Sequence, residues 1–226
     1  MGCTFKGYNL DDYGVIFEKM PAIKKPKRRT EDIYIDNKDG YKPNELGYDG
    51  YTSESIAILT ESEHFDFLKG LFDGPGALIR NDDPTRYINA KILNEVEYQV
   101  LGNALLATIE FTIEHPFKYL VADVPQVITT FPNTITNNGN VYSRPYLTIE
   151  GSGSVTVTIN GTTFSYNFPV GEDVEMDCEV QDSYHEGILR NQYMSGYYPR
   201  LEPGSNAISI TGSVTSVKVE NASRWL

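Results

Sequence analysis

Cysteine is nearly absent from this sequence of 226 residues, and the two that occur, Cys3 and Cys178, stand far apart in the chain. Two distant cysteines give neither a disulfide framework nor the paired spacing of a zinc site. We therefore expect two free thiols, as in a protein that is assembled in a reducing cytoplasm.

Long apolar runs and an excess of positive charge are also missing. No stretch approaches the roughly 18 consecutive apolar residues of a membrane-spanning helix, and residues 1–10 lack the apolar segment of a secretory signal. The 19 Lys and Arg are outnumbered by 31 Asp and Glu, which gives a net charge of −12. Binding to nucleic acid depends on clustered cations, so we expect neither a nucleic-acid-binding protein nor a membrane protein.

Catalytic and metal-binding patterns are equally scarce. The three histidines, His64, His115 and His185, do not stand at metal-pair spacing. Ser195 lacks the leading glycine of a nucleophile elbow, and the run Gly151–Ser154 lacks the lysine of a phosphate-binding loop. The sequence therefore predicts no enzyme, no cofactor and no metal.

The many carboxylates leave one catalytic alternative open, because a pair of them could hydrolyse a glycoside. The densest group comprises Glu172, Asp173, Glu175 and Asp177, along one predicted strand edge. Alternate members of a strand share a face, where like charges repel each other. We interpret the group as a solvated face.

Strand-forming residues are plentiful, including 16 Tyr and 10 Phe, and tyrosine also favours interfaces. Alternation of apolar and polar residues predicts strands throughout the chain. In the first half these are Ser53–Leu59, Ala77–Arg80, Tyr87–Leu93, Val96–Val100 and Ala104–Ile113, and in the second half Tyr146–Ile149, Val155–Ile159, Phe164–Phe168, Val174–Cys178, Ala207–Ile210 and Val214–Val219. Gly151–Ser154 is interpreted as a turn, and Asn160-Gly161 is the sharpest hairpin pattern.

One helix interrupts the strands. Thr60 and Glu63 fit a capping box, and apolar residues then follow at helical spacing from Phe65 to Phe72. The run Asp73–Gly76 should end the helix, because it contains glycines and a proline. The fold class is therefore mainly β. A change of character near Asp123 divides it into a β-rich domain with one helix, 1–123, and a β-sandwich, 124–226.

Two segments of the first domain have an unusual composition. Pro21–Arg29 holds five basic residues and two prolines, which indicates an extended connector. Tyr41–Tyr51 is rich in Gly, Pro, Asn and Tyr, which indicates a long loop or arm. We expect Tyr41, Tyr48 and Tyr51 to contact another subunit, and an exposed loop without function is an equal alternative.

Several stretches together resemble the distal tail protein family of siphophages. They are Asn138–Pro145, Ile149–Gly153, Val155–Gly161, Leu201–Asn206 and the closing Arg224-Trp225. The start of the chain, Phe5 to Phe17, and the helix that follows a long hairpin are also similar to that family. The resemblance covers nearly the whole chain.

The resemblance implies a fold and a set of partners. The first domain would be a belt, six copies of which close into a ring, and the second a galectin-like β-sandwich on the outside. The ring would form the baseplate hub at the virion tail tip, assembled in the host bacterial cytoplasm. It would join the tail tube protein to the tail-associated fibre or lysin protein and to receptor-binding or other baseplate proteins, and DNA would pass through without specific binding.

Two functions from other classes remain open. A carbohydrate-binding module is supported by the predicted β-sandwich, because Trp225 and exposed tyrosines could stack on sugar rings. A wall-degrading enzyme is the third hypothesis, and it lacks a convincing site. A hub of a contractile tail is a close variant of the first hypothesis.

Overall fold

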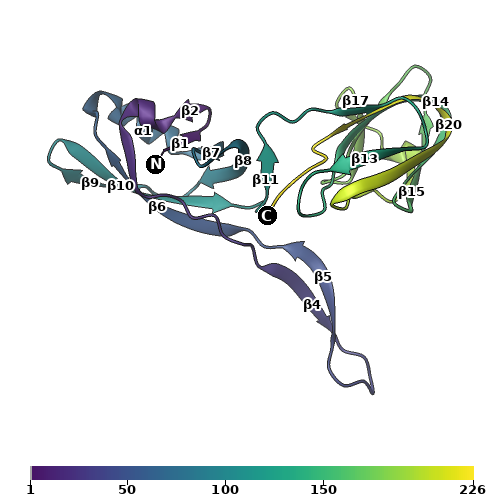
Figure 1. The fold of residues 1–226 in the computed structure, drawn as a ribbon, viewed down its shortest axis with the longest axis horizontal. Coiled ribbons are helices and arrows are strands. Elements are labelled where there is room, and N and C mark those ends of the chain that lie inside the picture. The colour runs from purple at the N-terminus through teal and green to yellow at the C-terminus, as the bar shows by residue number, and fades with distance from the viewer. Residues whose placement is uncertain (1) are drawn as a thin grey trace. The chain divides into compact units, whose positions relative to one another are not determined.

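The computed structural model describes residues 2–226 and is mainly β. The chain divides into two compact units, one ending at Val121 and the other spanning Ala122–Trp225 (Figure 1). Each unit has its own hydrophobic core.

The first unit contains a nine-stranded sheet with one helix. Its strand order is β2-β1-β7-β8-β10-β6-β3, with β11 beside β8 and β9 beside β10. The strands are β1 Cys3–Phe5, β2 Tyr8–Asn9, β3 Val15–Lys19, β6 Tyr51–Leu59, β7 Gly74–Arg80, β8 Asp83–Ile92, β9 Glu97–Leu101, β10 Ala104–Ile113 and β11 Lys118–Leu120. The helix α1 spans Phe65–Leu71, and the 3-10 turns η1 and η2 span Leu10–Tyr13 and Ser62–His64.

The core of this unit lies on one face of the sheet. Alternate residues of β10 are buried from Ala107 to Ile113, as the alternation of apolar and polar residues in Ala104–Ile113 predicts for a strand with one inward face. Leu68 and Leu71 of α1 are buried in the same cluster, as the helical spacing predicted. Burial on one face of strand and helix is what holds this unit together.

The start of the helix differs from the expected capping box. The Thr60 hydroxyl donates to the backbone carbonyl of Gly14 at 2.9 Å, and neither η2 nor α1 has a side-chain cap. The reason is strand pairing, because Leu59 lies opposite Val15 and so keeps Thr60 beside Gly14. Thr60 therefore extends the β3–β6 ladder, and the helix begins five residues later.

Ile56 and Ile58 share a face of β6, and this face is more exposed than the opposite face of the strand. The inward positions of β6 include Ser53 and Ser55, both buried. The Ser55 hydroxyl is satisfied by donating to the carbonyl of Ile109 at 3.2 Å. Small residues suit this side because bulky residues of β10 lie opposite them.

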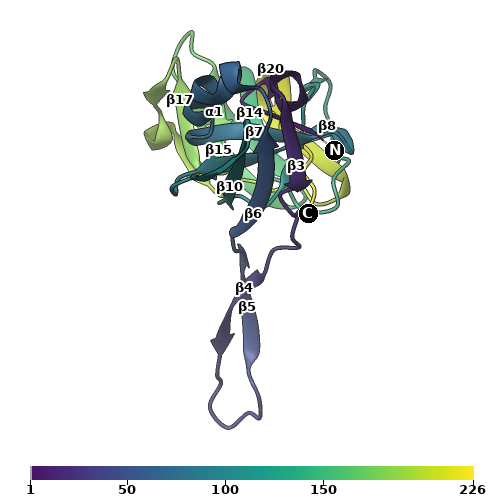
Figure 2. The same cartoon turned by 90° about the vertical axis from the view of Figure 1, so that its left-hand side faces the viewer.

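The two unusual segments pair with each other. β4 (Arg28–Ile33) and β5 (Lys42–Tyr48) form a separate two-stranded antiparallel ladder, here called the arm. In both cartoon views the arm stands clear of the sheet of its own unit (Figures 1 and 2). The expectation of a loop over Tyr41–Tyr51 and of a connector up to Arg29 was therefore wrong in part. Pro43 fits this strand because a two-stranded ladder consists of edges.

Nine described strands of the second unit also form one sheet. Its order is β12-β20-β14-β16-β17-β18, with β13 beside β20, β15 beside β14, and β19 beside β15. The strands are β12 Gln126–Ile128, β13 Asn133–Asn137, β14 Tyr146–Ile159, β15 Thr162–Phe168, β16 Val174–Asp177, β17 Asp182–His185, β18 Ile188–Leu189, β19 Met194–Gly196 and β20 Gly204–Glu220, and the 3-10 turn η3 is Asn191–Tyr193.

Two long strands, β14 and β20, run through both halves of this sheet. Gly151–Ser154 lies within β14, so the expectation of a turn there was wrong. The β14–β20 ladder instead shifts register between Glu150 and Thr156, as a bulged strand does at a corner. Gly212 of β20 has φ +108, and a Cβ there would lie 2.6 Å from the carbonyl of Ser154. Bulges and glycine thus bend strands that the sequence pattern had divided.

The bent sheet encloses one core. Its first half, around β16, contributes Leu147 and Met176, and its second half, around β15, contributes Val157 and Phe164. Across the described residues of this unit the regular elements are strands and η3, so each half covers the other. The Asn160-Gly161 turn is confirmed, because both residues have positive φ and join β14 directly to β15.

Candidate interaction surfaces

The tip of the arm presents apolar side chains without a sheet behind them. Every residue of β4 is exposed, and Tyr34 and Tyr41, in the loop between the strands, are 74% and 58% exposed. Their ring centroids lie 6.0 Å apart. Ile33 and Ile35 beside them are exposed as well. Exposed apolar groups of this kind are common where proteins contact other molecules.

The base of the arm is held by polar and aromatic contacts. The Arg28 guanidinium donates to Glu45 at 2.5 Å and to the Tyr48 hydroxyl at 3.0 Å. It also lies 5.3 Å from the centroid of the Tyr48 ring. The other contact of Tyr48 is an edge-to-face packing on Phe117, at 5.6 Å between centroids. These contacts fix where the arm leaves its unit.

The three tyrosines singled out in the sequence are therefore in different situations. Tyr41 is exposed at the tip, whereas Tyr48 is engaged at the base. Tyr51 begins β6, is half-buried against the core, and has the Lys24 ammonium 6.0 Å from its ring. Burial raises the pKa of the Tyr51 hydroxyl. A contact role for all three stays a prediction, and Tyr41 offers the most surface for it.

A second apolar group lies on the outer face of the first unit's sheet. Ile16, Ile58 and Leu106 occupy neighbouring positions of β3, β6 and β10 in register. Ile16 is 55% exposed, and the other two are half-buried. β3 lies at an end of the sheet order, so this row reaches a strand edge. Sequence reasoning missed the row, since it needs the pairing of three distant segments.

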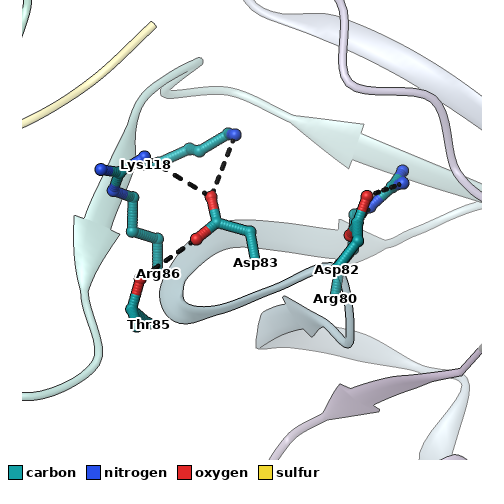
Figure 3. A network of polar contacts seen from close by, with 6 residues as sticks. All are labelled: Arg80, Asp82, Asp83, Thr85, Arg86 and Lys118. Atoms are coloured by element: carbon teal, nitrogen blue, oxygen red, sulfur yellow. Dashed lines mark hydrogen bonds and ion pairs between the residues drawn. The ribbon is translucent and has the colours of Figure 1, made fainter.

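The turn between β7 and β8 carries a dense set of ion pairs (Figure 3). Arg80 donates two hydrogen bonds to Asp82, at 2.8 and 2.7 Å, and a third to a backbone carbonyl. Those bonds lower the pKa of Asp82. Asp83 lies 3.3 Å from Lys118 and 3.6 Å from Arg86. Each carboxylate is neutralised by a neighbouring cation, so these ion pairs stabilise the turn and the start of β8.

The acidic group on and beside β16 is also engaged. Glu172 accepts two hydrogen bonds from Arg190, at 2.8 and 3.0 Å, and Asp173 lies 2.6 Å from His185. Glu175 accepts a hydrogen bond from the hydroxyl of Tyr146 at 2.6 Å, and Asp177 accepts backbone N–H bonds. These four acids are half-buried, and Arg190, His185, Tyr146 and backbone N–H groups contact them, so the group is less solvated than expected.

The remaining histidines have plain surroundings. His64 lies 3.3 Å from Glu61 and 4.0 Å from Glu63, at the exposed start of the helix region. His115 is exposed just after β10.

The stretches that carry the family resemblance converge on a buried polar network in the second unit. The Asn137 side chain donates to the carbonyls of Val141 and Leu201, at 3.0 and 3.1 Å. Buried Arg224 donates to the carbonyl of Tyr142 at 2.6 Å. A Cβ on Gly139 would lie 1.9 Å from the carbonyl of Arg224, so only glycine fits there.

Asn206, in the Pro-Gly-Ser-Asn stretch, completes this network. Its side chain is fully buried and donates to the carbonyls of Ile135, Glu202 and Gly204, at 3.2, 2.9 and 2.9 Å. Its oxygen accepts from the backbone N–H of Glu202 at 2.7 Å. The resemblance therefore rests on residues that fix the fold of this unit rather than on a reactive site.

Similarity to known proteins is found among solved structures. Neither the protein-family models nor the curated proteins give a match. Among solved structures, the SPP1 Dit (gp 19.1) protein, described as a paradigm of the hub adsorption apparatus in phages infecting Gram-positive bacteria, aligns with a TM-score of 0.74. It is 15% identical, and the alignment covers 100% of this chain and 99% of that one.

Two structures of the phage P2 baseplate in its activated conformation are also similar. The calcium form gives a TM-score of 0.54 at 9% identity, over 95% of this chain and 92% of that one. The strontium form gives 0.53 at 10% identity, over 94% and 92%. No described helix is long and apolar enough to cross a membrane. The alignment with the SPP1 Dit protein shows that the chain has a Dit-like fold, mainly β with curled sheets, over its full length.

Proposed function

We propose that this chain is a structural, non-enzymatic subunit of the hub at the distal end of a long phage tail, where six copies close into a ring. The observation that carries the proposal is the fold, which aligns with that of the SPP1 Dit protein over almost the whole length of both chains. The unit up to Val121 would form the ring, and the unit from Ala122 to Trp225 would be a galectin-like outer domain. The protein would lie at the virion tail tip.

The arm supports a ring built from copies of this chain. A two-stranded ladder on its own is marginally stable in water. Its exposed Ile33, Tyr34, Ile35 and Tyr41 would gain stability by covering apolar surface of a neighbour. The row of Ile16, Ile58 and Leu106 is such a surface and reaches the β3 edge. Contacts between two different surfaces generate rings when the rotation closes.

The other partners follow from a hub position. The ring would join the tail tube protein on one side and the tail-associated fibre or lysin protein on the other, and the outer units would hold receptor-binding or other baseplate proteins. A net charge of −12 disfavours adhesion of DNA that passes through the ring. The role needs no cofactor and no catalytic group.

The solution mass tests the ring. Light scattering of the full chain, alone and with the neighbouring tail protein, should give six copies in at least one of the two conditions. Changing Ile33, Tyr34, Ile35 and Tyr41 to serine should reduce the mass to that of one copy. Val170→Ser is the matched control, because that exposed apolar residue lies in the other unit. A wild-type chain that stays monomeric with its partner present would contradict the proposal.

A further inference from the structure

A cavity of about 540 Å³ opens at the surface of the second unit. It lies between the β14–β15 turn, the segment that follows β16, and residues 197–200. Its lining includes Arg144, Gln181, Tyr197, Tyr198 and Arg200. The volume falls within the roughly 300–1,000 Å³ of small-molecule sites. The proposed hub role does not involve this cavity.

Arg144 is the charged group of this cavity that lacks a counter-ion. It is half-buried, and within residues 2–226 no carboxylate pairs with it. The nearby acids are already engaged. Arg200 holds Glu202 at 2.7 Å and Arg224 holds Glu179 at 3.2 Å.

Asp177 accepts the backbone N–H groups of Glu179 and Val180, at 2.9 and 3.3 Å, and among the described residues no ion pair joins it to Arg144. Burial raises the pKa of Cys178, so its thiol stays neutral beside the guanidinium. A half-buried cation without a partner favours an anionic ligand.

The cavity also offers a positioned aromatic ring. Tyr197 is 78% exposed, yet its backbone N–H donates to the carbonyl of Thr163 at 3.3 Å. The preceding Gly196 has φ +103, and a Cβ there would lie 2.5 Å from that same carbonyl. The backbone that carries Tyr197 is therefore fixed by close approach to β15. A large exposed ring on a fixed backbone suits contact with the apolar face of a ligand.

Hydrogen-bonding groups surround the same space. The hydroxyl of Tyr198 is already committed, since it lies 2.9 Å from the hydroxyl of Ser183 and 3.2 Å from the Asn191 side chain. In the described part of the chain the side-chain amide of Gln181 has no hydrogen-bond partner, and the hydroxyl of Tyr197 has none either. Aromatic surface, free amide and hydroxyl groups and one unpaired cation together match the groups of a sugar that carries a negative charge.

We propose that this cavity binds a saccharide bearing an anionic group, with Arg144 pairing with the anion and Tyr197 lying against the sugar ring. A neutral sugar would leave the Arg144 charge uncompensated, and a bare inorganic anion would leave Tyr197 without a contact. The anion can be a phosphate or a carboxylate, since a guanidinium binds both through paired hydrogen bonds. The site lies within one unit, so it does not depend on ring formation.

Calorimetry on the full chain tests the site with four probes. They are glucose 1-phosphate, glucuronic acid, glucose and inorganic phosphate. At least one of the two anionic sugars should bind ten-fold or more tighter than both glucose and inorganic phosphate. The comparison between the two anionic sugars identifies which anion the site prefers. Equal affinity for glucose, equal affinity for inorganic phosphate, or no binding of either anionic sugar would overturn the proposal.

Variants assign the binding to the named groups. Arg144→Gln should weaken the preferred probe at least ten-fold, Arg144→Lys should weaken it less, and Tyr197→Ala should weaken it about five-fold. Lys218→Gln is the matched control, with an expected change below three-fold because Lys218 does not line the cavity. An unchanged thermal unfolding midpoint shows that each variant is folded. Binding that survives Arg144→Gln in a folded protein would refute the site.

Discussion

The molecule contains two antiparallel hairpins that contrast in almost every respect. In the arm, β4 is exposed along its whole length, and its neighbour β5 is exposed except at its base. In the hairpin of β14 and β15, every second residue of β15 from Phe164 to Phe168 is buried. One ladder faces solvent on both sides, and the other contributes to a closed core.

The contrast shows that hydrogen-bonded pairing alone does not say what a hairpin is for. The β14–β15 hairpin is stabilised within its own unit, because every second side chain of β15 from Phe164 to Phe168 is buried in the core. The arm lacks such a core, and its contacts are concentrated at its base around Arg28 and Tyr48. Its order at the tip should therefore depend on surface that another molecule provides.

The largest expected difference comes from removing one ring in each hairpin. Phe164→Ala should lower the free energy of unfolding by about 3–5 kcal/mol, because it leaves a cavity in the core. Tyr41→Ala should change that free energy by less than about 0.5 kcal/mol in the single chain. Urea unfolding followed by fluorescence measures both. Similar losses for the two variants would mean that the arm is stabilised within its own chain.

The second effect concerns the buried polar network around Asn206 in the second unit. Asn206→Ala should lower the free energy of unfolding by about 2–3 kcal/mol, since buried carbonyls lose their donor. Asn167→Ala on the exposed face of β15 is the matched control and should change little. If the two asparagine variants unfold at the same urea concentration, the network does not stabilise the unit.

A third comparison uses pH. The hydrogen bonds from Arg190 hold the pKa of Glu172 below its ordinary value, so the ion pair stabilises the fold above that value. The stabilisation is lost as pH falls through the lowered pKa. Wild type and Glu172→Gln should therefore differ at neutral pH and converge in acid. Glu45→Gln in the arm should have a smaller effect, because the Arg28–Glu45 pair is mostly exposed. A constant difference at all pH values would rule out the ion pair as its cause.

The smallest effect should be a slight gain in stability. The Tyr166 hydroxyl is buried without a hydrogen-bond partner among the described residues, and burial raises its pKa to about 12. Tyr166→Phe should therefore leave the free energy of unfolding unchanged or raise it by up to about 1 kcal/mol. Tyr198→Phe is the control, and it should lower stability because that hydroxyl has two partners. A destabilised Tyr166→Phe would reveal a partner, such as a buried water.

Local patterns in the sequence predicted local structure well. The inward face of β10, the apolar face of α1 and the Asn160-Gly161 turn all depend on residues close in the chain. The continuity of β14 and β20 could not be predicted in this way, because Gly151–Ser154 is typical of a turn as well as of a bulge. Which one forms is decided by the ladder with β20, some sixty residues away.

The interaction surfaces were the least predictable part. The tyrosine-rich arm could be noticed from composition, yet β5 could not be predicted as a strand, since Pro43 and Gly47 argue against a regular ladder. The row of Ile16, Ile58 and Leu106 and the cavity around Arg144 each need segments that are distant in sequence. Neither has a local motif, because each consists of residues that only the fold brings together.

The way the second unit closes has a consequence for its connectivity. The Asp123 side chain, at its start, accepts the backbone N–H of Asn221 at 2.8 Å, and β12 pairs with the last residues of β20. The first and last residues of the unit therefore lie close together, as is common in domains that tolerate insertion and circular permutation. A circularly permuted form, with the old ends joined by a short linker and new ends opened at Asn160-Gly161, should keep the fold.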